Sequence, residues 1–151
     1  MWEKIKSDIR NFNFNNEDER VVLNANYFSA YRRIPVLRTF GDRSGYFGVM
    51  FITRETNRRR YPEDIVRHEY GHSKQMKVLG PLRFGFCIGI PSRFKWGEES
   101  YYDKPWEVIA DVRGGVRSRR PDAETVRRGE EYLEASRREG IRVWRRIKKK
   151  F

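Results

Sequence analysis

Residues 61–72 read Tyr61-Pro62-Glu63-Asp64-Ile65-Val66-Arg67-His68-Glu69-Tyr70-Gly71-His72, and they set the expected fold. Proline suits the first turn of a helix, and acidic residues suit its positive dipole end. The stretch therefore predicts a helix that starts at its proline and continues to Leu79. Gly80 then ends the helix, and Pro81 prevents its continuation.

The two histidines of the chain, His68 and His72, stand four residues apart on this predicted helix. Four residues correspond to about 6 Å along a helix axis, so both imidazoles emerge on one face and can meet a single tetrahedral metal ion. Ile65, Met76 and Leu79 lie near the same stripe, which places the histidines on the buried face of the helix.

Glu69 follows His68 directly and can reach the side of the metal where a bound water sits. We therefore expect Glu69 to activate a zinc-bound water for peptide hydrolysis. The alternative is a pair of core or surface histidines with an ordinary glutamate between them.

A third ligand is expected to be a carboxylate, because the chain has no further histidine and Cys87 is its only cysteine. Glu107 stands near the start of a second predicted helix, which Pro105 opens, and lies one turn before Asp111. Two imidazoles and one carboxylate suit Zn²⁺ best and leave a fourth position for water. Asp111 is expected to accept the other ring N–H of His68. Alternatively, Glu107 is an ordinary exposed residue, and Asp111 pairs with Arg113 or Arg117.

The pattern His68-Glu69-x-x-His72 followed by Glu107-x-x-x-Asp111 resembles that of gluzincins, the thermolysin-like zinc metallopeptidases. The strings Gly80-Pro81-Leu82 and Gly89-Ile90-Pro91-Ser92 also resemble small bacterial relatives of that clan. The resemblance covers residues 46–113. It implies a zincin-like fold, a Zn²⁺ cofactor and a peptide or protein substrate.

The resemblance also implies a rim strand and an oxyanion donor. In such enzymes a strand that precedes the active-site helix pairs with an extended substrate, which points to Tyr46–Thr53. Many members supply a separate histidine or tyrosine to stabilise the oxyanion. The chain has no third histidine, so Tyr101 and Tyr102, just before the Glu107 helix, are the candidates. The alternative for both tyrosines is simple packing.

The rest of the chain completes an α+β domain that spans residues 1–151. A short helix is expected over residues 2–10, and the β-branched runs Val21–Leu37 and Tyr46–Thr53 predict an antiparallel hairpin. Residues 80–104 have no clear period and are expected to form an ordered connection and not a pair of strands. A third long helix should follow Pro121, weaken at Gly140 and end as a basic helical extension, residues 119–151, with Ile141, Trp144 and Ile147 on one side.

The formal net charge is +12, and residues 117–151 hold 13 Lys/Arg and 6 Asp/Glu, a net of +7. Such a field attracts anionic partners such as nucleic acid or acidic lipid, and the alternative is a solvated helix face. A second function class is therefore a basic binding module whose zinc site is structural or degenerate. Its contacts would come from three basic clusters with Trp144 and Phe151 nearby: Arg58–Arg60, Arg119–Arg120 and Arg145–Lys150.

Location is indicated by three features. A single cysteine excludes an internal disulfide and fits a reducing compartment. The N-terminus has no continuous apolar region of the secretory type. The most apolar stretch, residues 78–91, is too short to cross a bilayer as a helix and is expected to pack on the core or touch a membrane surface. We expect a cytoplasmic protein, with contact at a membrane surface open.

Overall fold

The computed structural model describes residues 1–97 and 99–148, so Lys149, Lys150 and Phe151 of the expected basic extension lie outside the described residues. The chain begins with two short helices, α1 (Trp2–Asn11) and α2 (Glu19–Asn24), and α1 confirms the helix expected over residues 2–10. The Asp8 carboxylate accepts hydrogen bonds from the backbone N–H groups of residues 26, 27 and 28 at 2.9, 2.6 and 3.2 Å, which ties α1 to the start of the sheet.

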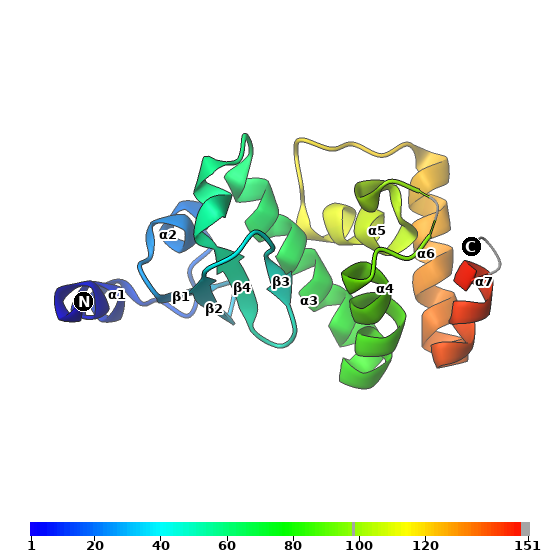
Figure 1. Ribbon diagram of the computed structural model, residues 1–151, viewed down its shortest axis with the longest axis horizontal. Helices are drawn as coiled ribbons and strands as arrows, with labels where there is room; N and C mark the ends of the chain where they lie inside the picture. The colour runs from blue at the N-terminus through cyan, green and yellow to red at the C-terminus, as the bar shows by residue number, and fades with distance from the viewer. Residues whose placement is uncertain (98, 149–151) are drawn as a thin grey trace.

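The sheet has four strands in the order β1-β2-β4-β3: β1 (Phe28–Tyr31), β2 (Ile34–Thr39), β3 (Gly45–Tyr46) and β4 (Met50–Thr53). Strands β1 and β2 are antiparallel, β4 is parallel to β2, and β3 is antiparallel to β4 (Figure 1).

The predicted antiparallel pairing of Val21–Leu37 with Tyr46–Thr53 is wrong. The first run divides into α2, β1 and β2, and its second strand pairs with β4 in parallel. The turn between β1 and β2 is formed by Arg32-Arg33, whose φ angles are 46° and 68°. Positive φ at both central residues is the geometry of a tight hairpin turn, but it is usually marked by Asn or Gly and not by arginine. The sequence therefore did not display the turn.

Helix α3 (Pro62–Phe84) extends from the sheet to the C-terminal helices (Figure 1). Its regular part ends where predicted, because Gly80 has φ 78° and ψ 163°, outside the helical region. In its described residues, the connection over residues 80–104 contains no strand, as expected, but its first half is helical through η2 (Gly85–Gly89) and α4 (Ile90–Arg93), which the sequence did not predict. Pro81 ends one helix and starts the next turn, and the buried Phe84, Cys87 and Ile88 hold that turn on the core.

The C-terminal half contains η3 (Tyr101–Asp103), α5 (Pro105–Gly114), α6 (Ala123–Glu139), η4 (Gly140–Val143) and α7 (Trp144–Lys148). The break at Gly140 is confirmed, with φ 57°. Of the residues expected on one side of this segment, Ile147 is buried but Ile141 is exposed, and Val143 is buried in its place. The 3₁₀ turn after the break changes the register of the apolar positions.

Two apolar clusters hold this α+β fold together. The sheet cluster packs α2, the sheet and α3, and the helical cluster packs the end of α3 with η2, α5, α6 and the C-terminal turns. The sheet cluster consists of Val22, Leu23, Tyr31, Ile34, Val36, Met50, Ile52 and Val66. The helical cluster consists of Leu79, Phe84, Cys87, Ile88, Trp106, Ile109, Tyr132, Leu133, Ala135, Val143 and Ile147. Within residues 1–97 and 99–148, no helix is long and apolar enough to span a bilayer.

Candidate metal centre

Helices α3 and α5 approach each other backbone to backbone at two glycines. A Cβ atom at Gly71 would lie 1.8 Å from the carbonyl oxygen of Ala110, and one at Gly114 would lie 1.8 Å from that of Arg67. No residue with a side chain fits at either position without moving a helix, since real Cβ atoms do not approach backbone this closely. This contact brings the first turn of α5, with Glu107, beside the histidines of α3.

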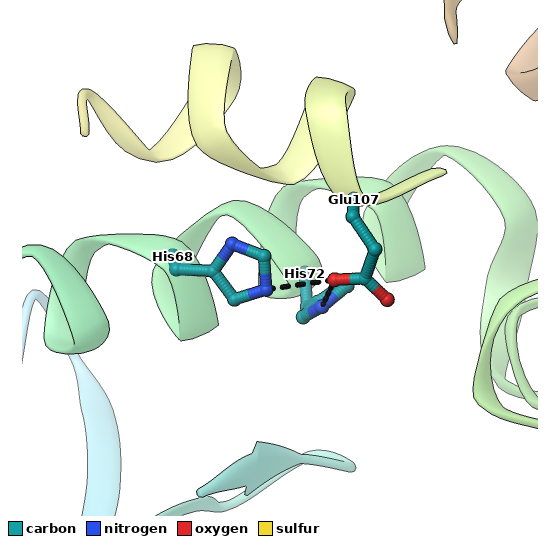
Figure 2. Close-up of side chains that lie close together, drawn as sticks. All are labelled: His68, His72 and Glu107. Atoms are coloured by element: carbon teal, nitrogen blue, oxygen red, sulfur yellow. Dashed lines mark ion pairs between the residues drawn. The ribbon is translucent and has the colours of Figure 1, made fainter. Parts of the chain in front are cut away.

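The side chains of His68, His72 and Glu107 converge between the two helices, as Figure 2 shows, and we call them the ligand group. Glu107 Oε2 lies 2.9 Å from His68 Nε2 and 3.4 Å from His72 Nε2. Each of the three side chains offers a ligand atom, and these atoms all lie within 4.8 Å of one another. All three residues are buried, and Glu107 is fully so.

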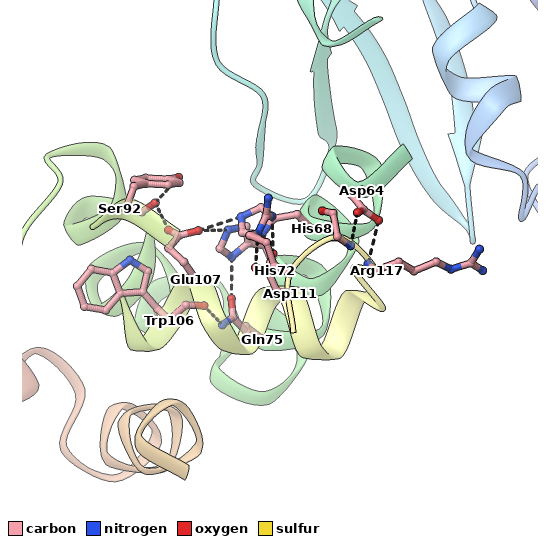
Figure 3. Close-up of polar contacts among 12 residues, drawn as sticks. Asp64, His68, His72, Gln75, Ser92, Trp106, Glu107, Asp111 and Arg117 are labelled. Carbon is pink, nitrogen blue, oxygen red and sulfur yellow. Dashed lines mark hydrogen bonds and ion pairs between the residues drawn. The ribbon is translucent and has the colours of Figure 1, made fainter. Parts of the chain in front are cut away.

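The other ring nitrogen of each histidine is held by a hydrogen bond (Figure 3). His68 Nδ1–H donates to Asp111 Oδ1 at 2.6 Å, because a carboxylate only accepts. His72 Nδ1–H donates to Gln75 Oε1 at 2.7 Å. The Gln75 amide has this orientation because its NH₂ group donates to the carbonyl of Trp106 at 2.7 Å. Both imidazoles therefore carry their hydrogen on Nδ1 in the neutral state, and both Nε2 lone pairs face Glu107.

With both imidazoles neutral, three electron-pair donors face one another in a buried space without a hydrogen between them. Glu107 Oε2 is buried and has no hydrogen-bond partner, a costly state that a cation would relieve. Ligands of a tetrahedral zinc, each about 2 Å from the metal, stand roughly 3.3 Å apart. The 2.9 and 3.4 Å separations fall on either side of that value. The ligand group therefore fits a small divalent cation.

The charge balance of the site also favours a cation. Burial alone would raise the pKa of Glu107, but the adjacent His72 and His68 hold it well below its usual range. Burial would lower the pKa of His68, but its hydrogen bond to Asp111 and the adjacent carboxylate of Glu107 hold it well above its ordinary value. Both shifts come from the same cause, because two buried carboxylates flank one imidazole and attract positive charge to it.

Arg119 completes the surroundings of Asp111, which pairs with neither Arg113 nor Arg117. The Arg119 guanidinium donates from Nε to Asp111 Oδ2 at 2.7 Å and from Nη2 to Oδ1 at 2.8 Å. The loop that carries it is held by Asp64, in the first turn of α3, whose carboxylate accepts from the backbone N–H groups of residues 117 and 118 at 3.0 and 2.8 Å. Figure 3 shows the bond from Asp64 to Arg117.

Glu69 lies on the open side of the ligand group. Its carboxylate is buried, its Oε2 has no hydrogen-bond partner, and burial raises its pKa. Together with His68, Tyr101 and Tyr102, it lines a pocket of about 540 Å³. The site therefore has solvent-sized space beside an unpartnered carboxylate.

The two tyrosines occupy different positions on the wall of this pocket. The Ser92 hydroxyl donates to Glu107 Oε1, so the Tyr101 hydroxyl donates its own hydrogen to Ser92 Oγ at 3.1 Å. The Tyr102 ring stacks against the Arg119 guanidinium, 3.9 Å from the ring centroid, and is 44% exposed. A catalytic role for either tyrosine stays a prediction.

The expected rim strand, Tyr46–Thr53, is wrong in its second half. Met50 and Phe51 of β4 pair with β2 on one side and with β3 on the other, so both edges are occupied at these two residues. The two edge strands are β1 and β3 (Gly45–Tyr46), and Ser44, which precedes β3, lines the pocket. Beside the pocket, pairing with an extended chain is therefore open at β3.

Sequence reasoning missed Gln75, Ser92 and Arg119. Gln75 stands three residues after His72, a spacing that brings side chains together on a helix, so this partner could have been found. Ser92 and Arg119 reach the site from segments whose paths depend on tertiary packing, and no local pattern marked them.

Comparisons of the chain with protein-family models, with curated proteins and with solved structures found no match. The likeness to the HExxH…E arrangement of zincins therefore rests on the buried His68, His72 and Glu107, and on the two helices that carry them.

Proposed function

We propose that the protein is a zinc-dependent metallopeptidase that hydrolyses peptide bonds. The observation that carries the proposal is the position of Glu69, a buried and unpartnered carboxylate beside the ligand group and on the wall of an open pocket. A structural zinc site is closed by four protein ligands, whereas a catalytic one has three and keeps an open position. Three ligands and an adjacent base match the second type.

In this proposal His68, His72 and Glu107 hold the metal. Zinc at this position would supply a Lewis acid and lower the pKa of a water molecule toward neutrality. Glu69 takes a proton from the attacking water and delivers it to the leaving amine. Burial raises its pKa, which helps it to hold the proton between the two transfers. Tyr102 is the better candidate for the oxyanion donor, because the hydroxyl hydrogen of Tyr101 is engaged by Ser92.

The test combines metal content with hydrolysis. The full chain should hold one zinc per molecule by elemental analysis and cleave peptides of a quenched fluorescent library. Glu69→Gln should keep the zinc and lose at least about a hundredfold in kcat, and His72→Ala should lose the zinc. Glu63→Gln, on the same helix, is the matched control and should change neither quantity. Undiminished hydrolysis by Glu69→Gln would contradict the assigned base.

A second candidate is the basic binding module. It is favoured by three exposed arginines in the C-terminal part, Arg120, Arg142 and Arg145, which have no acidic partner within the described part of the chain. It is weakened by α6, where Arg127 pairs with Glu124 and Glu131 at the surface. Binding to anionic vesicles or oligonucleotides that falls steeply with salt, with no hydrolysis by zinc-replete protein, would favour this candidate.

A further inference from the structure

Five cationic side chains line the pocket beside Glu69. Arg119 is paired with Asp111, and we call the other four the cationic rim: Arg43, Arg59, Arg60 and Lys95. All four are exposed, and none has a carboxylate partner in the ranges that the structure describes. Apart from Glu69, Asp42 is the single acidic residue among those that line the pocket. The rim therefore has a net positive charge that the protein does not neutralise.

Several arginines elsewhere on the molecule are paired with carboxylates. Arg67 binds Glu19 and Asp64, Arg137 binds Glu134, and Arg119, which also lines the pocket, binds Asp111. Such pairing is the ordinary arrangement of a charged surface. Its absence around one concave site leaves a positive potential where field lines are focused by the surrounding low-dielectric walls.

On both sides of the pocket, hydrogen bonds fix the backbone segments that carry the cationic rim. Arg43 precedes Ser44, whose hydroxyl accepts from the backbone N–H of Thr53 at 3.2 Å and shares a hydrogen bond with Thr56 at 3.2 Å. These bonds tie the loop before β3 to η1 (Arg54–Arg58), directly before Arg59 and Arg60.

On the other side, Lys95 belongs to the turn after α4. The buried Lys104 ammonium donates to the backbone carbonyls of Lys95 and Gly97 at 3.2 and 3.1 Å, and also to that of Trp96. Lys95 itself has φ 54°, a conformation that side-chain-bearing residues rarely adopt. The backbone that carries the fourth cation is therefore held in place by a dedicated internal contact.

We propose that this pocket binds peptide segments rich in Asp and Glu, with their carboxylates on the cationic rim. The inference rests on the proposed peptidase function, because it names the substrate class of the same site. An extended acidic segment beside the β3 edge would place side chains next to Arg43, Arg59 and Arg60, and its backbone next to Glu69 and the ligand group. Arginine forks suit carboxylates, since they bind them through two parallel hydrogen bonds.

The test measures binding separately from cleavage. Two labelled twelve-residue peptides differ only in having Glu or Gln at the same four positions, and fluorescence anisotropy gives their affinities for zinc-replete Glu69→Gln protein. At low salt the Glu peptide should bind about tenfold more tightly. The preference should fall to about twofold or less in an Arg59→Gln/Arg60→Gln background and should weaken with added salt.

The matched control removes two positive charges from α1, Lys4→Gln and Arg10→Gln. Figure 1 places α1 at the N-terminal end of the molecule, away from α5. If this control abolishes the preference as completely as the rim variant, net charge and not the rim is responsible, and the inference fails. The inference also fails if the two peptides bind equally or if neither binds. It fails as well if an oligonucleotide of equal charge displaces the Glu peptide from wild-type residues Arg59 and Arg60 but not from the rim variant.

Cleavage assays with wild-type protein separate this inference from the proposed function. Preferential binding of the Glu peptide without cleavage of any peptide supports the acidic-peptide site and overturns the peptidase. Cleavage of both peptides with equal kcat/KM overturns the acidic preference and supports the peptidase. A higher kcat/KM for the Glu peptide that is lost in the rim variant supports both.

Discussion

The α3–α5 contact and the sheet cluster are both buried, but they are built from opposite kinds of residue. The sheet cluster is apolar, and its contacts need nothing further to be favourable. The α3–α5 contact, where two glycines let the helix backbones approach closely, buries the ligand group, Asp111 and Gln75. Its carboxylates and imidazoles were taken out of water at a cost that their mutual hydrogen bonds offset in part.

The sheet cluster therefore stabilises the fold, whereas the α3–α5 contact forms the candidate metal site. The sheet cluster should stabilise the protein to the same degree whether or not a metal is present. The α3–α5 contact should gain stability when a cation joins the ligand group, since binding to the native state alone shifts the folding equilibrium. Each prediction below changes a residue in or beside one of the two regions and compares the effects on stability and on zinc affinity.

Gly71→Ala should have the largest effect, because its Cβ would overlap the Ala110 carbonyl at 1.8 Å. The helices must separate, which should cost about 3 kcal/mol or more in the free energy of unfolding and lower zinc affinity by more than about a hundredfold. Denaturant unfolding and zinc titration measure the two effects. Gly85→Ala is the control on the same stretch, since its Cβ would meet only Phe47 at an ordinary 3.5 Å. Equal losses in both variants would show that the contact is not specific.

Ile52→Ala should break the sheet cluster without affecting the metal centre. Ile52 is fully buried, and its truncation should cost about 3 kcal/mol. The rise in Tm on adding zinc should be as large in this variant as in wild type, whereas His72→Ala should show no such rise. Thermal unfolding with zinc and with chelator measures both. A zinc-dependent rise that disappears in Ile52→Ala would show that the two regions are coupled.

The sequence predicted the metal centre better than the sheet. The ligand group lies on two helices with clear boundaries. The spacing of its residues along these helices therefore predicted which way the side chains point. The parallel pairing of β2 with β4 depends on the position of β3, which lies between them in sequence and reverses the chain direction. No local sequence pattern predicts this reversal. Helical residues 81–93 were missed because Gly80 and Pro81 ended the prediction, although Pro81 also starts a turn. Arg119 was missed because Asp64, 55 positions earlier in the chain, fixes its loop.

Asp64 holds the loop that carries Arg119, and lowering the pH should reveal its contribution to stability. Burial would raise its pKa, but hydrogen bonds from residues 117 and 118 and from Arg67 lower it to about 2 from an ordinary 3.8. A depressed folded-state pKa stabilises the native state above pH 3.8, and this stabilisation is lost as the pH falls through about 2. The expected contribution is about 2 kcal/mol at neutral pH. The difference in unfolding free energy between wild type and Asp64→Asn should shrink by this amount between pH 5 and about 2.

A constant difference across that range would mean that the charge of Asp64 contributes nothing and that the loop is held by shape alone. The matched control is Asp122→Asn, the helix cap of α6. This change removes a carboxylate that also accepts backbone hydrogen bonds but lies outside the metal centre. It should leave zinc affinity unchanged, whereas Asp64→Asn should weaken it through the loop that carries Arg119.

Gln75 gives the smallest and most selective effect, because it touches the metal centre only through His72. Gln75→Leu removes the acceptor for His72 Nδ1–H and leaves the Trp106 carbonyl without its donor. Zinc affinity should fall about tenfold to a hundredfold, as for other partners of ligating histidines. Gln75→Glu restores an acceptor for His72 but not a donor for Trp106, so it should recover zinc affinity while remaining less stable than wild type. If both variants lose the same zinc affinity, Gln75 acts by packing, and the orientation of His72 does not depend on its hydrogen bond.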